Sequence, residues 1–189
     1  MSRREGHRAR AWWLGKWIWT LEDVIPPDPL AVCVGINPAP LSVAVGHYYQ
    51  GDLGKRFFER LRSVGLLPTE PGWEDDAGAG AGIGFTDIVK RPTARAEDVR
   101  PDDYEFGKAL LERKLAEVKP RLVIFTFKRA AEQFFGDFKG NGFVRGLAIG
   151  SARVFVMPGP TEERQKAERT LRSLRRAVQA MRSATPSRD

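Results

Sequence analysis

Residues 31–40 read AVCVGINPAP, a short apolar and β-branched run that stops at an Asn-Pro pair. The proline-rich PPDP precedes the run, so the pattern predicts a buried strand at 31–36. Three further runs have the same character: GIGFTDIV at 82–89, RLVIFTF at 121–127 and ARVFVM at 152–157. Nearly continuous apolar strands of this kind are typical of a parallel sheet that is covered on both faces.

Helical patterns lie between and after these runs, at 55–64, 104–118, 128–135 and 164–181. In the last of them apolar residues recur at three- and four-residue spacing, while the arginines occupy the other face. Strands that alternate with helices predict an α/β fold class: a single domain with a central, mostly parallel sheet of about four to five strands, flanked by helices. In such sheets ligands bind where the loops gather at the carboxyl ends of the strands.

Length and composition are those of one soluble globular domain, with 189 residues, 42% hydrophobic and 29% charged. We expect a basic, Trp-rich extension at 1–20, a main domain at 21–183 and a disordered tail at 184–189. The chain shows no membrane-spanning run and no secretory signal, so we expect a cytoplasmic protein without a membrane partner. The single Cys33 lies in an apolar run and cannot by itself hold zinc or an iron–sulfur cluster, so we expect a core thiol, no metal and no cofactor.

The net charge of +7 favours an anionic partner such as nucleic acid, because Lys and Arg neutralise phosphates. Basic residues gather at 3–16 and 164–182, where solvated helix faces and frayed ends are the alternative explanation. The segment WWLGKWIW at 12–19 holds four of the five Trp residues. An aromatic cluster near a terminus usually packs on the domain, and base stacking by these indoles is the other possibility.

Polar residues occur where the predicted strands end. Asn37 follows the first strand, Asp87 lies in the second, and Met157-Pro158-Gly159-Pro160 follows the last. Asp87 interrupts an otherwise apolar run, and an isolated buried carboxylate is too costly without a reason. Two structural alternatives stay open: Asn37 could help to end its strand as an Asn-Pro turn, and Asp87 could cap a turn or pair with Lys90 or Arg91.

Four segments from about Leu21 to Met181 resemble, in the same order, the mismatch-specific uracil/thymine DNA glycosylases of the uracil-DNA glycosylase superfamily. They are LEDVIPPDPLAVCVGINPAP, VGHYYQGDLGKRFFERLRSVGL, GIGFTDIVKRPTARAEDV and VFVMPGP. The resemblance implies a monofunctional DNA glycosylase that flips uracil out of DNA, from U:G mismatches and other contexts, and hydrolyses its N-glycosidic bond to start base excision repair. Residues 21–183 would then be the catalytic domain.

The resemblance also implies roles for individual residues. Asn37 would hold a water near the sugar carbon, and Tyr49 would stack on the flipped base. Asp87 would face the developing sugar cation and accept a proton from that water. The other implied residues are Gly35, Ile36, Tyr48 and Lys55 in the base pocket, and Pro158, Gly159, Pro160, Thr161 and Arg164 in a DNA-binding wedge.

Departures from the family pattern limit the resemblance. Ala39 stands where the family has Gly, Lys55 stands where Asn is usual, and relatives carry Asn or Lys at the position of Asp87. The segment MPGPTEER replaces a Ser-rich or Gly-Leu-Ser-Arg wedge. The expected partner is double-stranded DNA containing uracil or a mismatched pyrimidine, and also single-stranded DNA, bound by a nucleoid-associated monomer. The alternative is a non-catalytic protein of the same fold that binds nucleic acid or abasic sites.

Overall fold

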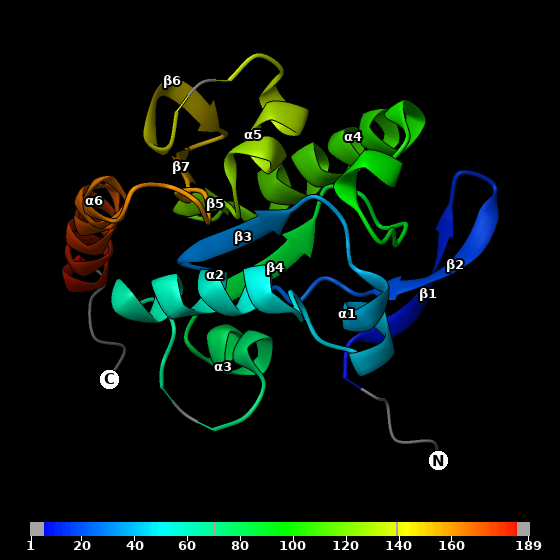
Figure 1. Cartoon of the computed structure of the whole chain (residues 1–189), viewed down its shortest axis with the longest axis horizontal. Helices are drawn as coiled ribbons and strands as arrows, with labels where there is room; N and C mark the ends of the chain where they lie inside the picture. The colour runs from blue at the N-terminus through cyan, green and yellow to red at the C-terminus, as the bar shows by residue number, and fades with distance from the viewer. Residues whose placement is uncertain (1–5, 70, 139, 185–189) are drawn as a thin grey trace.

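The computed structural model describes residues 6–69, 71–138 and 140–184. Five strands form one central sheet, in the spatial order β4-β3-β5-β7-β6 (Figure 1). Their bounds are β3 Ala31–Gly35, β4 Ile83–Asp87, β5 Leu122–Phe125, β6 Gly142–Ile149 and β7 Ala152–Val156. The first four strands in this order run parallel, and the edge strand β6 pairs antiparallel with β7. The α/β single domain with a mostly parallel sheet is therefore confirmed.

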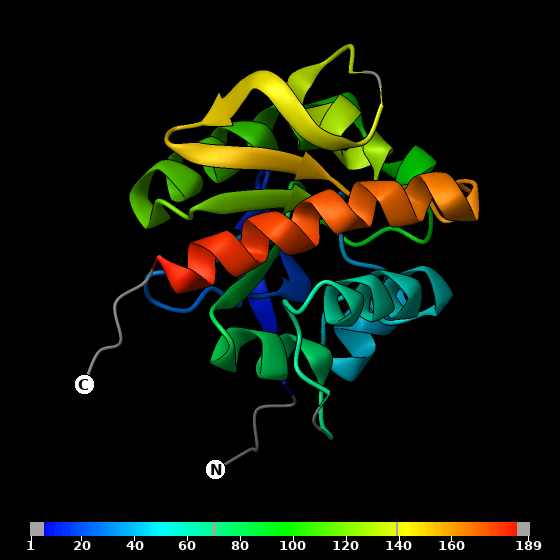
Figure 2. The ribbon, with the colours of Figure 1, turned by 90° about the vertical axis from the view of Figure 1, so that its left-hand side faces the viewer.

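Helices cover both faces of the sheet (Figures 1 and 2). They are α1 Pro40–Val45, α2 Asp52–Ser63, α3 Glu74–Gly80, α4 Pro101–Val118, α5 Lys128–Phe135 and α6 Arg164–Ser183, with a short 3-10 turn at Ala96–Asp98. Apolar side chains of α2 and α6 pack on one face of the sheet, and those of α4 and α5 pack on the other. Residues of β3, β4 and β5 are buried throughout because each strand is covered on both sides. Cys33 lies in this core, as expected, and burial raises the pKa of its thiol.

All four predicted helices are present, with ends that differ by no more than three residues. The sequence patterns missed β6, the short helices α1 and α3, and a hairpin near the N-terminus. Helix α3 contains the Gly-rich stretch EDDAGAG, which has poor intrinsic helix propensity. Gly78 is needed there because a Cβ at this position would lie 2.5 Å from the ring of Phe85.

The hairpin consists of β1 (Arg8–Trp13) and β2 (Lys16–Leu21), which pair antiparallel beside α1 (Figure 1). Trp13 is buried, and its indole Nε1 donates a 2.8 Å hydrogen bond to Oδ1 of Asp103. The packing expected for the Trp cluster therefore holds for Trp13, whereas the other three indoles are exposed. The expected tail falls almost wholly outside the described residues, as do residues 1–5.

Among the described helices, none combines the length and the apolarity that crossing a membrane requires.

Candidate active site

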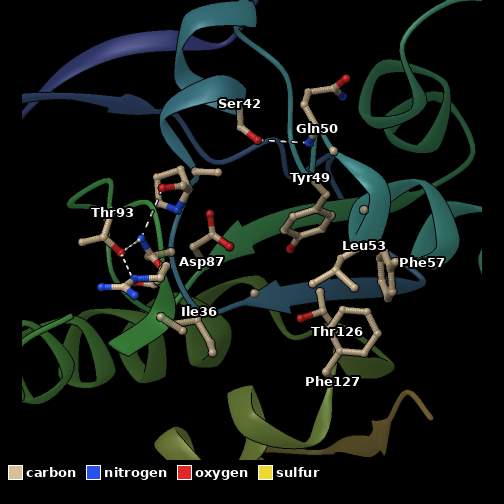
Figure 3. Close-up of a pocket in the computed structure, with 18 of the residues that line it drawn as sticks. Ile36, Ser42, Tyr49, Gln50, Leu53, Phe57, Asp87, Thr93, Thr126 and Phe127 are labelled. Carbon is tan, nitrogen blue, oxygen red and sulfur yellow. Dashed lines mark hydrogen bonds between the residues drawn. The ribbon is translucent and has the colours of Figure 1, made fainter. Parts of the chain in front are cut away.

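A cavity of about 380 Å³ opens where β3, β4 and β5 reach their carboxyl ends (Figure 3). Its volume lies within the range of roughly 300–1,000 Å³ that is usual for small-molecule sites. The lining comes from the ends of these strands, from α1, from residues 49–57 and from residues 93–96. The cavity therefore lies at the edge of the sheet where the parallel topology predicts a ligand site.

Asp87 is the last residue of β4, opposite Gly35 of β3 in the strand register. Its carboxylate points into the space between Thr93 and Tyr49 (Figure 3). The residue is 3% exposed, and neither carboxylate oxygen has a hydrogen-bond partner among the described residues. A buried carboxylate without hydrogen bonds is costly, so the fold maintains this group at a price in stability.

Burial raises the pKa of Asp87 to about 7, against the opposing effect of the nearby Lys90 charge. Lys90 lies behind Asp87, beside a smaller cavity of about 160 Å³ that both residues line. The ammonium forms an ion pair with Asp23 and lies 3.1 Å from the hydroxyl of Tyr48. Lys90 thus acts on Asp87 through its charge, without a hydrogen bond to it, and Arg91 pairs with Asp103 instead.

Gly35 makes room for the Asp87 carboxylate. A Cβ at position 35 would lie 2.1 Å from Oδ1 of Asp87 and 2.8 Å from a ring carbon of Tyr49. Any side chain at this position would displace one of these two groups, so the glycine is a requirement of the site.

Asn37 lines the same cavity as Asp87, and its side-chain amide is held through its nitrogen. Its Nδ2 donates to Oγ1 of Thr93 at 2.9 Å and, more weakly, to the carbonyls of Arg91 at 3.3 Å and Pro38 at 3.2 Å. The Thr93 hydroxyl in turn donates to the carbonyl of Arg95 at 2.6 Å. All these bonds engage the amide nitrogen, so the amide oxygen keeps its capacity to accept a hydrogen bond from a bound water.

Tyr49 forms an aromatic wall of the cavity. Its hydroxyl donates to the carbonyl of Thr86 at 2.8 Å, which fixes the ring against β4. The ring contacts Phe57 edge-on, with centroids 5.5 Å apart, and Leu53 and Phe127 line the same cavity (Figure 3). The structure thus gathers Gly35, Ile36, Asn37, Tyr49 and Asp87 around one cavity.

Two residues expected in the base pocket do not line this cavity. Tyr48 is completely buried behind the cavity, where its hydroxyl donates to the carbonyl of Glu22. Lys55 is exposed on α2 and does not line the cavity, because the helix presents Leu53, Gly54 and Phe57 to it instead.

The expected wedge residues follow β7 at the same edge of the sheet, but they do not line the cavity. Arg60 of α2 donates to the carbonyls of Pro158 and Gly159, the latter at 3.1 Å, and so holds the start of this loop. Thr161 is exposed, and Arg164 begins α6 in an ion pair with Glu168 at 2.9 Å. The loop therefore lies at the same edge of the sheet as the cavity, but its residues are not part of the cavity lining.

Sequence reasoning missed several polar residues of the cavity lining, among them Thr93 and Gln50. Gln50 is held at its backbone N–H by Oγ of Ser42 at 3.0 Å (Figure 3). The TAR stretch around Thr93 follows the Asp87 strand, yet nothing local indicates that Thr93 meets a residue 56 positions earlier.

A second cluster lies away from the cavity and contains both histidines of the chain. One ligand atom from each of His7, His47, Asp75 and Asp76 lies within 4.8 Å of the others. His47 Nδ1 is 2.8 Å from Asp75, and His7 Nε2 is 2.8 Å from Asp76. The His7–Asp76 pair connects the residue before the hairpin to α3, and the His47–Asp75 pair connects the segment after α1 to the same helix.

A family model for the uracil DNA glycosylase superfamily matches residues 22–182. The match covers every strand of the central sheet and all residues of the cavity lining.

Proposed function

The chain belongs to the uracil DNA glycosylase superfamily, and we propose that it is a monofunctional glycosylase that hydrolyses the N-glycosidic bond of uracil in DNA. The family acts on DNA, which agrees with the positive net charge of the chain. One observation carries the finer proposal: the Asp87 carboxylate is buried, without a hydrogen-bond partner among the described residues, and points into a cavity that Asn37 also lines.

The hydrolysis requires different roles of Asn37 and Asp87. Breaking the bond between sugar and base places positive charge on the sugar, and a nearby carboxylate stabilises that charge. The amide oxygen of Asn37 orients the attacking water but is a very poor proton acceptor. Asp87, with a pKa raised to about 7 by burial, is matched to accept the proton of that water near neutral pH.

The Lys residues of the structure support hydrolysis rather than attack by an amine. Lys90, whose charge acts on Asp87, lines the smaller cavity and is paired with Asp23. No lysine lines the larger cavity in the described part of the chain. We therefore propose that the enzyme leaves an abasic site and does not cleave the strand through a Schiff base.

The test is an excision assay with the purified chain on end-labelled oligonucleotides that carry one uracil in U:G, U:A and single-stranded contexts. We expect strand breaks only after alkali, which cleaves abasic sites, and none on a matched C:G control. Strand breaks without alkali would contradict the monofunctional mechanism. If the protein binds abasic DNA but releases no uracil in any context, the non-catalytic alternative replaces this proposal.

Thr93→Val should lower the single-turnover excision rate about five- to tenfold, because Asn37 loses the hydrogen bond that orients its amide, and such a bond contributes about 1 kcal/mol. Thr93 is a positioning residue, so substrate binding should change little while the chemical step slows. Thr93→Ser retains the hydroxyl and should restore most of the rate. Equal losses in the Val and Ser variants would exclude this role.

Tyr49→Phe should be mild and Tyr49→Ala severe. Stacking on a base is worth roughly 1–3 kcal/mol by truncation, which corresponds to about a 5- to 150-fold loss in affinity for the flipped nucleotide. The hydroxyl only anchors the ring to the Thr86 carbonyl, so its loss leaves the stacking face in place. Single-turnover rates and melting temperatures should be measured together, with Tyr49→Leu as an apolar, non-aromatic control. Similar effects of Phe and Ala would assign the function to the hydroxyl.

We also propose that residues 158–161 fill the gap left by the flipped base, since Arg60 holds this loop beside the cavity face. Changes in the loop should then weaken excision from duplexes more than from single strands, because only a duplex has such a gap.

A further inference from the structure

One face of the N-terminal hairpin is aromatic, basic and open to solvent. Its residues are Arg8, Arg10, Trp12, Trp17 and Trp19, and we refer to them as the outer face. Arg10 pairs with Trp19 and Trp12 pairs with Trp17 across the two strands. Trp12 is 57% exposed, Trp17 is 58% exposed and Trp19 is 51% exposed.

The fold does not require this exposure. The opposite, inner face attaches the hairpin to the domain through the bond from Trp13 to Asp103 and a 2.6 Å bond from the Thr20 hydroxyl to the Lys90 carbonyl. The inner face thus holds the hairpin on the domain, and the outer face is not needed for this attachment. Three large indoles gathered on an exposed surface are unusual in a monomeric protein and mark an interaction site.

Two arginine side chains place positive charge over the rings of the exposed indoles. The Arg8 guanidinium lies 4.4 Å from the ring centroid of Trp19, and the Arg10 guanidinium lies 5.5 Å from that of Trp17. These cation–π contacts hold the guanidinium groups in place over the aromatic surface. Residues 6–21 also include Lys16 and contain no Asp or Glu. The outer face therefore offers apolar ring faces beside fixed positive charges, with no acidic residue in the segment to oppose an anion.

We propose that the outer face of the hairpin binds single-stranded DNA. Its indoles stack on unpaired bases, and Arg8 and Arg10 contact phosphates, the combination by which proteins hold single strands without sequence preference. The base faces of a duplex are covered by their neighbours, so the indoles select the single strand. The hairpin lies beside α1, at the end of the molecule toward which β3 leads (Figure 1). Helix α1 also contributes Ser42 to the cavity lining, but this inference does not rest on the proposed glycosylase chemistry.

The test compares the full-length protein with a Trp12→Thr/Trp17→Thr/Trp19→Thr variant, in which threonine preserves β propensity. The probe is a fluorescein-labelled dT12 strand that contains no uracil, and binding is read by anisotropy and by quenching of tryptophan emission. We expect the triple variant to bind dT12 at least tenfold more weakly, because the loss of a single base stack already weakens binding about tenfold. Trp73→Thr is the matched control, since Trp73 is 44% exposed outside the hairpin, and it should bind dT12 like the wild type.

Excision of uracil from a short U:G duplex is measured in parallel and should be unchanged in the triple variant, so failure of either proposal is seen separately. Equal dT12 affinities of wild type and triple variant would overturn the inference, as would binding of wild type to phosphatidylglycerol vesicles but not to dT12. If circular dichroism shows the triple variant to be unfolded, Arg8→Gln/Arg10→Gln replaces it. That variant should lower the slope of log affinity against log salt by about 0.7 for each lost phosphate contact, and an unchanged slope would count against the site.

Discussion

Asp87→Asn should lower the single-turnover rate of uracil excision by about a hundred- to ten-thousandfold, the range expected for loss of a general base. The asparagine side chain has nearly the same shape, so the cavity should keep its form while losing the only group on β4 that can take a proton. Binding to abasic-site DNA should stay close to that of the wild type. Asn37→Ala should cost no more than Asp87→Asn, since Asn37 positions the water and Asp87 also faces the sugar cation.

The pH dependence follows from the pKa of about 7. Asp87 accepts a proton only when ionised, so the wild-type rate should rise as the pH increases through about 7 and then level off. Lys90 is the charge that lowers this pKa, and Asp87 in turn helps burial to raise the pKa of the Tyr48 and Tyr49 hydroxyls. Replacing the ammonium, as in Lys90→Met, should therefore move the rise to higher pH. A pH profile of the single-turnover rate measures both effects.

As the pH rises through about 7, the folding stability of the wild type should fall while its excision rate rises. The folded-state pKa of Asp87 lies above its ordinary value of 3.8, so the favourable contribution of the protonated form is lost as the pH rises through about 7. Asp87→Asn does not ionise and should melt at a higher temperature than the wild type at pH 8, with a smaller difference at pH 5. Asp52→Asn is the matched control, because it removes an exposed carboxylate from the same cavity lining and should alter neither rate nor melting temperature. If Asp87→Asn excises uracil at nearly the wild-type rate, Asp87 is structural.

Asp103→Ala should lower the free energy of unfolding by about 3–5 kcal/mol, because it removes a buried carboxylate that is the partner of the buried Trp13 indole and of the half-buried Arg91 guanidinium. Asp103 accepts hydrogen bonds from the Arg91 guanidinium at 2.6 and 2.9 Å and from the Trp13 indole at 2.8 Å. It also accepts the backbone N–H of Arg100 at the start of α4. One carboxylate thus joins the hairpin, the segment that leads to Thr93, and α4.

Chemical and thermal unfolding measure this effect, and a fall in melting temperature on the order of 10 °C is expected for a domain of this size. Asp102→Ala is the control, since its neighbouring carboxylate is exposed in the same helical turn. Burial disfavours the charge of Asp103, but the bonds from Arg91, Trp13 and Arg100 outweigh it and lower the pKa to about 2. Because this folded-state pKa is depressed, the stabilisation is present above the ordinary value and disappears as the pH falls from about 4 to 2. Equal melting temperatures of the two variants would contradict the role of Asp103.

The two buried aspartates show how function is separated from stability in this fold. Asp103 is fully hydrogen-bonded and remains ionised, whereas Asp87 has no partner among the described residues and has a raised pKa. Unsatisfied buried groups are rare in native proteins and call for an explanation. The position of Asp87 in the cavity lining supplies one.

The sequence by itself determined the central architecture. The apolar runs that became β3, β4, β5 and β7 and the four amphipathic helices could be predicted because periodicity and β-branched content are local properties. The position of Asn37 and Asp87 at one edge of the sheet followed from parallel topology. Strand β6 was not predicted because it is a Gly-containing edge strand with exposed residues. The hairpin was not predicted because its Trp residues resembled a packed aromatic cluster rather than two alternating strands.

Only the tertiary structure decided which of the indicated side chains reach the cavity. Tyr48 and Tyr49 are neighbours in sequence, yet Tyr48 is buried behind the cavity while Tyr49, at a left-handed φ of 54°, forms its wall. The bond from Asn37 to Thr93 and the unpartnered state of Asp87 likewise depend on segments far apart in the chain. Whether a polar group is satisfied is a property of everything packed around it, and no local pattern of residue types contains that information.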